Sequence, residues 1–295
     1  MQTHWGECAV SDAHVHFFSH RFFEAMGAQC GKPAAHVATK LEWELPPADP
    51  TGLARLWVGE LDHHGVERAA LIASIPGDEA STVAAAASHP DRFYAYAMVN
   101  PQSEHTTIAK GLHGICLFPA MHSFSMQDAR VETLLEQAAA HRCAVFVHCG
   151  VLSVGVRKRL GLPSPFDMRF SNPLDLHSVA LRHPSVRFVV PHFGAGYFRE
   201  ALMLANLCPN VHLDTSSSNS WMRYEGLDLP TVFGRSLAVV GPRRLLFGTD
   251  SSFFPRGWNS DIFETQAKAL QTLGIGAVDA KLVLGENLHR ILTEF

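Results

Sequence analysis

The sequence has 295 residues, of which 47% are hydrophobic and 18% charged, a composition typical of a folded globular protein. Its formal net charge of -4 provides no basic excess to neutralise phosphates, so we expect no nucleic-acid partner. No stretch approaches the roughly 18 consecutive apolar residues of a membrane span, and we expect no membrane partner. The N-terminus lacks the basic start and apolar run of a secretion signal, and no cysteine belongs to a C-x-x-C pair. These features predict a cytoplasmic protein with reduced thiols.

In chain order, short apolar runs alternate with stretches that have helical spacing. The first strand is expected at 11–16, followed by a helix or covered loop at 17–28 and an irregular, proline-containing stretch at 31–50. Further apolar runs, as in parallel strands buried on both faces, predict strands at 67–74, 92–100, 113–118, 143–148, 186–192, 210–215 and 244–250. Apolar residues spaced three and four positions apart predict helices at 51–63, 79–88, 104–111, 128–141, 174–182, 197–207, 229–240, 262–273 and 278–292.

Eight strands that alternate with helices predict parallel strands joined by crossover helices. Eight such units in 295 residues match a (β/α)8 TIM barrel, of class α/β, better than an open doubly wound sheet. No G-x-G-x-x-G follows the first strand, so the main motif of a dinucleotide-binding fold is missing. We therefore expect one domain over residues 1–295, with extended loops after the strands and a helix near the C-terminus.

Histidine and aspartate residues stand at the predicted ends of several strands. In TIM barrels the carboxyl ends of the strands carry the active site. His14 and His16 point to one face of the first strand, because side chains alternate along a strand. The fifth, sixth and eighth strands end in His148, His192 and Asp250. A lone histidine is commonly a hydrogen-bonded core residue and a lone aspartate a helix cap. Five metal-competent side chains at one end of a barrel, however, predict a metal site.

The motifs around these residues resemble those of the amidohydrolase superfamily. They are D-x-H-x-H at 12–16, a histidine after strand five, H-x-G-x-G at 192–196, G-T-D at 248–250 and the closing stretch L-G-E-N-L-H-R-I-L at 284–292. More narrowly, the chain is similar to the amidohydrolase-related branch, which combines metal-dependent hydrolases with non-oxidative decarboxylases of the aminocarboxymuconate-semialdehyde type. The resemblance extends over essentially the whole predicted barrel.

The resemblance implies one divalent metal ion, zinc or alternatively manganese, with four ligands: His14, His16, His148 and Asp250. It implies that His192 is a general acid or base, or a further ligand. Asp12 is expected to orient the ligands through hydrogen bonds. Many binuclear relatives place a metal-bridging lysine at the end of strand four, where this chain has Ile115-Cys116-Leu117-Phe118. A two-metal site is therefore not expected, and Cys116 is expected to be a packed thiol rather than a ligand.

Such a site supports two reactions. A metal held by three imidazoles and one carboxylate keeps positive charge, so it acidifies a bound water and polarises a substrate oxygen. Our first hypothesis is a hydrolase of an amide, ester or lactone bond in a small anionic substrate, in which Asp250 or His192 takes a proton from the water. The alternative is a non-oxidative decarboxylase of an aromatic or muconate-like carboxylic acid on the same metal. A metal-storing or ligand-binding barrel is the non-enzymatic alternative.

Substrate contacts are expected from the loops after the strands. Arg157, Arg256 and Trp221 are the candidates, because arginine pairs with carboxylates in fork geometry and aromatic residues pack against rings. A nucleophilic Cys149 is a further alternative, although the sequence offers no separate base for it. Barrels of this type often form dimers, so we expect a homodimer by analogy.

Overall fold

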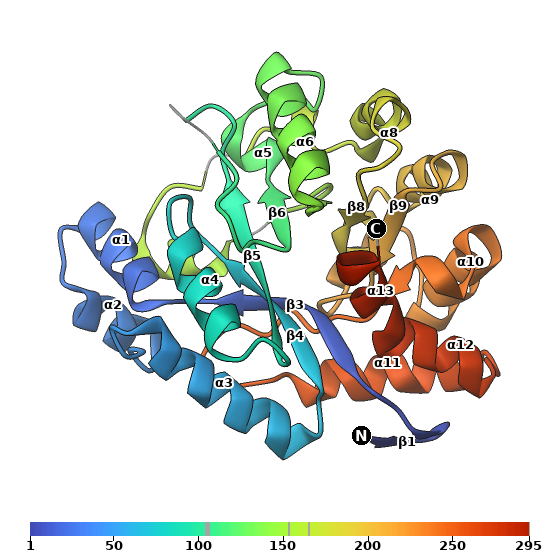
Figure 1. The fold of residues 1–295 in the computed structure, drawn as a ribbon, viewed down its shortest axis with the longest axis horizontal. Helices are drawn as coiled ribbons and strands as arrows, with labels where there is room; N and C mark the ends of the chain where they lie inside the picture. The colour runs from blue at the N-terminus through green and yellow to red at the C-terminus, as the bar shows by residue number, and fades with distance from the viewer. Residues whose placement is uncertain (104–106, 153, 165, 295) are drawn as a thin grey trace.

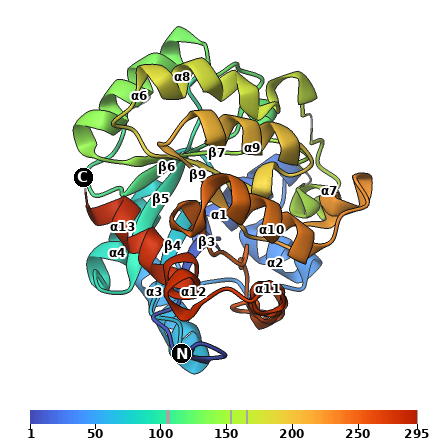
Figure 2. The ribbon, with the colours of Figure 1, turned by 90° about the vertical axis from the view of Figure 1, so that its right-hand side faces the viewer.

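The computed structural model describes residues 1–103, 107–152, 154–164 and 166–294. Its centre is an eight-stranded sheet in which all neighbouring strands are parallel and follow one another in chain order from β3 to β10. The strands are β3 (Ser11–Phe17), β4 (Arg68–Ala73), β5 (Phe93–Val99), β6 (Gly114–Leu117), β7 (Ala144–Val147), β8 (Phe188–Val190), β9 (Val211–Asp214) and β10 (Leu245–Leu246). Helices surround this ring (Figures 1 and 2), which confirms the predicted (β/α)8 TIM barrel.

The barrel is closed by main-chain hydrogen bonds between residues 13–16 of β3 and residues 247–251, a contact that we call the closing seam. The Asp250 N–H donates to the His14 carbonyl (3.0 Å), and the His16 N–H donates to the Ser251 carbonyl (2.7 Å). A parallel bridge joins the same two segments. The seam therefore brings residues from the first and last strands of the ring to one end of the barrel.

Thirteen α-helices lie within the described residues. They are α1 (His20–Cys30), α2 (Ala34–Leu41), α3 (Pro50–His64), α4 (Glu79–Ser88), α5 (Pro119–His122), α6 (Ala129–His141), α7 (Gly155–Leu160), α8 (His177–Arg182), α9 (Phe198–Leu207), α10 (Leu229–Val240), α11 (Ser260–Thr272), α12 (Ala277–Lys281) and α13 (Asn287–Thr293). Local chemistry fixes their ends: the Asp49 carboxylate accepts from Thr51 N–H at the start of α3, and Gly65 ends that helix in the left-handed conformation. None of the described helices is both long and apolar enough to cross a membrane.

The interior of the barrel is filled from its amino end by helix α13. Leu288, Ile291 and Leu292 of this helix belong to the same buried cluster as Tyr96 and Phe146, which point inward from β5 and β7. Figure 1 shows α13, in dark red, in front of the strands. Because apolar side chains close the amino end, the carboxyl ends of the strands are left for the polar residues described below.

Two helices lie where the sequence predicts irregular chain. The stretch 31–50 contains α2, and the loop after β7 contains α7. Pro33 stands directly before α2, a place where proline does not interrupt a helix. The two helices pack on each other, because Val37 and Leu41 share a buried cluster with Val156 and Leu160.

Two predicted helices differ from the structure, and one hairpin was not predicted. Of the helix expected at 104–111, residues 104–106 lie outside the described residues, and residues 107–111 form coil and turn. The helix expected at 278–292 is divided by a π-helical turn, Leu282–Glu286. At that turn Gly285 lies so close to the chain that a Cβ would stand 1.9 Å from the Ala9 carbonyl oxygen. The unpredicted hairpin pairs β1 (Gln2–Thr3) with β2 (Gly6–Glu7).

Candidate metal centre

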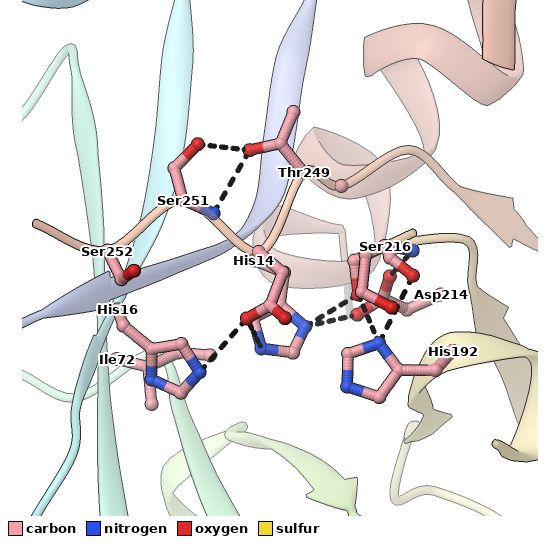
Figure 3. Close-up of polar contacts among 12 residues, drawn as sticks. His14, His16, Ile72, His192, Asp214, Ser216, Thr249, Ser251 and Ser252 are labelled. Carbon is pink, nitrogen blue, oxygen red and sulfur yellow. Dashed lines mark hydrogen bonds and ion pairs between the residues drawn. The ribbon is translucent and has the colours of Figure 1, made fainter. Parts of the chain in front are cut away.

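Three metal-competent side chains meet at the carboxyl end of the barrel, across the closing seam. The Asp250 carboxylate lies 3.2 Å from His16 Nε2 and 3.6 Å from His14 Nε2. The ligand atoms of the three residues all lie within 4.8 Å of one another. Figure 3 shows the two histidine rings beside each other on β3, with the third ring of His192 beyond His14.

The hydrogen bonds of the two imidazoles leave their Nε2 atoms available. His14 Nδ1 donates to the Asp214 carboxylate (2.8 Å), which is fully buried at the end of β9. His16 Nδ1 lies 2.7 Å from the Ser74 hydroxyl, which itself donates to a carbonyl and therefore accepts from the ring. Because each Nδ1 carries a proton, the neutral form of each ring has its lone pair on Nε2, the ring nitrogen that approaches Asp250.

Asp250 is held in an unusual backbone conformation. Its φ of 62° lies in the left-handed region, which costs a non-glycine residue about 1–2 kcal/mol. The main-chain bond from Asp250 N–H to the His14 carbonyl fixes this geometry. Burial raises the pKa of its carboxyl, but the contact with His16 and the positive charge of His14 and His16 whenever these rings are protonated outweigh burial, so the net pKa is below the ordinary value. Asp250 is therefore an anion next to both imidazoles.

Asp12 is an anchor for the main chain of the site rather than for a ring. Its carboxylate is fully buried and accepts from the backbone N–H groups of His14 (2.9 Å) and Thr249 (3.1 Å). It also accepts from the Thr249 hydroxyl (2.5 Å) and the Trp258 indole (2.8 Å). Burial raises its pKa to about 6, against the opposing effect of these hydrogen bonds. Asp12 thus ties β3 to the segment that carries Asp250.

His192 and His148 form a second pair of buried rings beside the first. The ring centroid of His192 lies 5.0 Å from that of His14 and 5.3 Å from that of His148. Neither belongs to the group of three metal-competent side chains found within the described residues. Burial, and then the neighbouring histidines, lower the pKa of both, so these imidazoles are neutral at pH 7.

Ser216 links the two histidine pairs. Its hydroxyl lies 2.8 Å from His14 Nδ1 and 2.9 Å from His192 Nδ1 (Figure 3). Its backbone N–H donates to the Asp214 carboxylate (2.6 Å). His192 itself has a positive φ of 55° in the turn after β8. The side chain of His192 is therefore oriented by a strained turn and by the loop after β9 together.

A cavity of about 600 Å³ opens on the four histidines and Asp250. His16, Phe18 and Trp43 line one side, with ring centroids 5.6 Å apart for His16 and Phe18 and 5.3 Å for Phe18 and Trp43. Phe253 continues this stack behind Trp43, at a centroid distance of 4.2 Å. The guanidinium of Arg256 ends the stack, 4.6 Å from the Phe253 ring. Such a wall suits a planar substrate with a negative charge.

The three residues predicted to contact substrate have different positions. Arg256 lines the cavity, and its guanidinium donates to the Ser252 hydroxyl (2.8 Å). Trp221 lines it too, with its indole N–H held by Asn219. Arg157 does not line the cavity, because its guanidinium is bound to the Pro163 carbonyl (2.7 Å) and to Gln29 (2.8 Å). Arg159, two residues further along α7, lines the cavity instead.

The cysteines near the site are buried thiols. Cys116 has no exposed surface, and burial raises its pKa well above the ordinary value. Burial raises the pKa of Cys149 to about 12, which makes it a poor nucleophile at neutral pH. All six cysteines are free.

The donor set fits a divalent metal. Catalytic zinc sites have three protein ligands and keep one position open, and imidazole nitrogen with carboxylate oxygen is a common combination. His14, His16 and Asp250 supply these donors next to a cavity. His148 adds a buried Nδ1 that has no hydrogen-bond partner among the described residues, an unsatisfied state that coordination of a metal would relieve.

Asp214, Ser216 and Ser74 belong to the site although the sequence analysis did not select them. Asp214 stands at the carboxyl end of the seventh strand, so the search of strand ends that found His148 and His192 could also have found it. Ser216 lies two residues beyond Asp214, in a serine-rich loop. Nothing in the sequence distinguishes it from the serines that follow.

Solved structures share this fold over nearly the whole chain. The 5-carboxyvanillate decarboxylase LigW from Sphingomonas paucimobilis is 16% identical, with a TM-score of 0.62 over 97% of this chain and 99% of that one. An amidohydrolase from Burkholderia multivorans with bound zinc is 15% identical, with a TM-score of 0.59 over 96% and 99% of the two chains.

Two comparisons concern the sequence itself. Protein fluG from Emericella nidulans is 38% identical over 85 residues, which are 29% of this chain and only 10% of that protein. The family model described as Amidohydrolase matches residues 11–292, a range that contains every side chain of the site. The chain therefore belongs to the amidohydrolase family.

Proposed function

We propose that this protein is a mononuclear metal-dependent hydrolase of an amide, ester or lactone bond in a small anionic substrate. The observation that carries the proposal is the convergence of His14, His16 and Asp250 within 4.8 Å at the mouth of a cavity of about 600 Å³. The cavity is within the usual size range for small-molecule sites. Arg256 at the end of the aromatic stack supplies a positive group for an anionic substrate.

The metal in this proposal is zinc or manganese, held by His14, His16 and Asp250 with His148 as a further ligand. When bound, a divalent cation supplies Lewis acidity that polarises a carbonyl and acidifies water. The chain supplies the proton transfers. His192 is neutral because burial lowers its pKa, so it accepts a proton from water and returns it to the leaving group. Asp250, which is ionised, is the second candidate base.

A decarboxylase of an aromatic or muconate-like acid is the second candidate. The stack of Phe18, Trp43 and Phe253 favours it, because a planar carboxylated ring would be held by its face in the cavity. In this reaction the neutral His192 takes a proton from water and gives it to the substrate carbon from which carbon dioxide departs, leaving hydroxide. Similarity to 5-carboxyvanillate decarboxylase supports this candidate at the level of the fold.

Elemental analysis of the purified protein tests the metal centre. We expect about one zinc or manganese ion per chain in the wild type and its loss in the His14→Ala and Asp250→Ala variants. His36→Ala changes an exposed histidine of α2 and is the matched control, which should keep the metal. Unchanged metal content in both site variants would overturn the proposal.

Product analysis separates the two reactions. The metal-loaded protein is offered anionic amides, esters and lactones, and separately aromatic and muconate-like acids. Hydrolysis produces a new carboxylate without gas, whereas decarboxylation releases carbon dioxide. In either case we expect His192→Gln to retain its metal and lose about 10²- to 10⁴-fold in turnover. Metal-loaded protein that turns over neither set would contradict both reactions.

A further inference from the structure

A second hollow, of about 780 Å³, lies at the amino end of the barrel, opposite the metal centre. Its charged and titratable lining residues are Arg142, Arg187, Arg243, Arg244, Arg290 and His212. Four of these arginines stand one or two residues before β7, β8 and β10, and the fifth is on α13. Because the strands are parallel, residues that precede them gather at the end of the barrel away from His14.

Two of the arginines hold the rim of the hollow in place. The Arg187 guanidinium donates to the carbonyls of Ile291 (2.7 Å) and Arg290 (3.2 Å), at the end of α13. Arg244 donates to the carbonyls of Ala205 (2.5 Å) and Cys208 (3.3 Å), at the end of α9. Cations at the carboxyl ends of helices are favourably placed, so these two residues are structural.

Other polar side chains of the hollow have hydrogen-bonding atoms without a partner among the described residues. The side chains of Arg142 and Arg243 form no hydrogen bond or ion pair with the described residues. Arg290 Nε is buried and has no hydrogen-bond partner among those residues. His212 is 5% exposed, and its buried Nδ1 has no partner there either. An unsatisfied buried polar atom costs about 1–3 kcal/mol, so two of them at one hollow indicate a missing partner.

The charge of the hollow indicates the kind of partner. None of the described residues that line it is acidic. The carboxylates of Glu67, Glu286 and Glu294 line a neighbouring hollow that shares Arg243 and Arg290 with this one. Five guanidinium groups around one space repel one another, and an anion with several oxygens would offset that repulsion.

We propose that this hollow binds a multivalent oxyanion, either free phosphate or the phosphoryl group of a small metabolite. Arginine forks match the geometry of phosphate oxygens, and the spare donors of Arg142, Arg243 and Arg290 approach the space from separate elements. His212 adds a nitrogen from the barrel interior. The volume exceeds that needed for one phosphate, so it also admits the body of a phosphate ester.

Isothermal titration of the metal-loaded protein with inorganic phosphate, and separately with adenosine 5′-monophosphate, tests the proposal at constant ionic strength. We expect saturable binding of at least one probe. An Arg142→Gln/Arg243→Gln double variant should weaken that binding at least tenfold. Tighter binding of the monophosphate identifies a phosphate ester as the ligand class, whereas tighter binding of inorganic phosphate identifies the free anion.

Three controls keep the test specific. Arg235→Gln removes an exposed arginine of α10 outside the hollow and should bind as the wild type does. Asp250→Ala should also bind normally, because its change is at the other end of the barrel. The Arg142→Lys/Arg243→Lys double variant keeps the charge but removes the paired guanidinium donors. It replaces the glutamine double variant in the test if that variant fails to fold. The proposal would be overturned if the wild type bound neither probe, or if the wild type and both double variants bound equally well.

Discussion

The carboxylate of Asp214 orients the ring of His14. It is fully buried and accepts a 2.8 Å hydrogen bond from His14 Nδ1. Burial alone would lower the pKa of His14, but the charge of Asp214 and its hydrogen bond raise the net pKa above the ordinary value. The same interaction makes the ring a more basic ligand.

We predict that Asp214→Asn weakens metal binding by about 10- to 100-fold while the protein stays folded. Asparagine keeps the shape and the acceptor for Ser216 N–H but removes the charge. Competition with a chromogenic chelator measures the affinity. Ser74→Ala, which removes the neutral partner of His16, is the comparison and should cost less. Equal affinity of Asp214→Asn and the wild type would show that the carboxylate does not tune the ligand.

For single residues, the candidate metal ligands could be predicted from the sequence, but their hydrogen-bond partners could not. His14, His16 and Asp250 could be selected because histidine and aspartate side chains, gathered at the carboxyl ends of barrel strands, are typical of a metal site. Which side chain bonds each ring could not be predicted, because the pairing of His14 with Asp214 and of His16 with Ser74 depends on the curvature of the closed sheet. Arg157 illustrates the opposite error, since a short helix turns it toward Gln29 and turns Arg159 toward the cavity.

Among the elements, the turn after β7 and the turn after β8 are locked together at Gly150. This glycine has a φ of +78°, and a Cβ there would lie 2.3 Å from the carbonyl oxygens of both Gly194 and Ala195. Its own N–H donates to the Ser171 carbonyl. The turns that carry His148 and His192 can approach each other only because this position has no side chain.

We predict that Gly150→Ala destabilises the protein by about 3 kcal/mol, from the left-handed backbone and the clash together. Gly161→Ala is the matched control, because Gly161 has a φ of +74° and open space around it. It should cost only about 1 kcal/mol. Urea unfolding at equilibrium measures both. If both variants lost the same free energy of unfolding, the turns after β7 and β8 would be able to move apart around the added methyl group without destabilising the protein.

Long helices with a regular apolar face were predictable, whereas short helices beside prolines were not. The helix expected at 128–141 is α6, because Asp128 caps it and four apolar residues share its buried face. By contrast, α2 is short and lies within a stretch that contains several prolines, where it packs on α1 and α7. The interruption of the last helix depends on the approach of Ala9 to Gly285, a contact across the whole chain.

For the molecule as a whole, His212 makes stability depend on pH. Burial first, and then the nearby arginines, lower its pKa from 6.5 to about 3 in the folded protein. Between these two values the unfolded chain binds a proton that the folded chain does not, so stability falls as the pH falls from about 6.5 toward 3. Above pH 6.5 both states are neutral and this effect is absent.

We predict that His212→Gln removes up to about 1.4 kcal/mol of pH dependence for each unit between pH 6 and 4. The measurement is the free energy of unfolding in phosphate-free buffer, for metal-free wild type and variant. His36→Gln, at an exposed position, should leave the slope unchanged. Parallel slopes for wild type and His212→Gln would mean that His212 is protonated in the folded state.

The barrel was predictable as a whole because eight alternating units leave few other arrangements. What the sequence could not reveal is how the ring closes, since β10 has only two residues and the seam continues through irregular chain.

That closure has a consequence for how the protein comes into being. His14 and His16 leave the ribosome long before Asp250 does. A chain that stops before the seam can form presents two imidazoles and no carboxylate. If the proposed metal binds there, its complete ligand set therefore forms only after both sides of the seam have been synthesised, and the bound ion would join two parts of the chain made at different times.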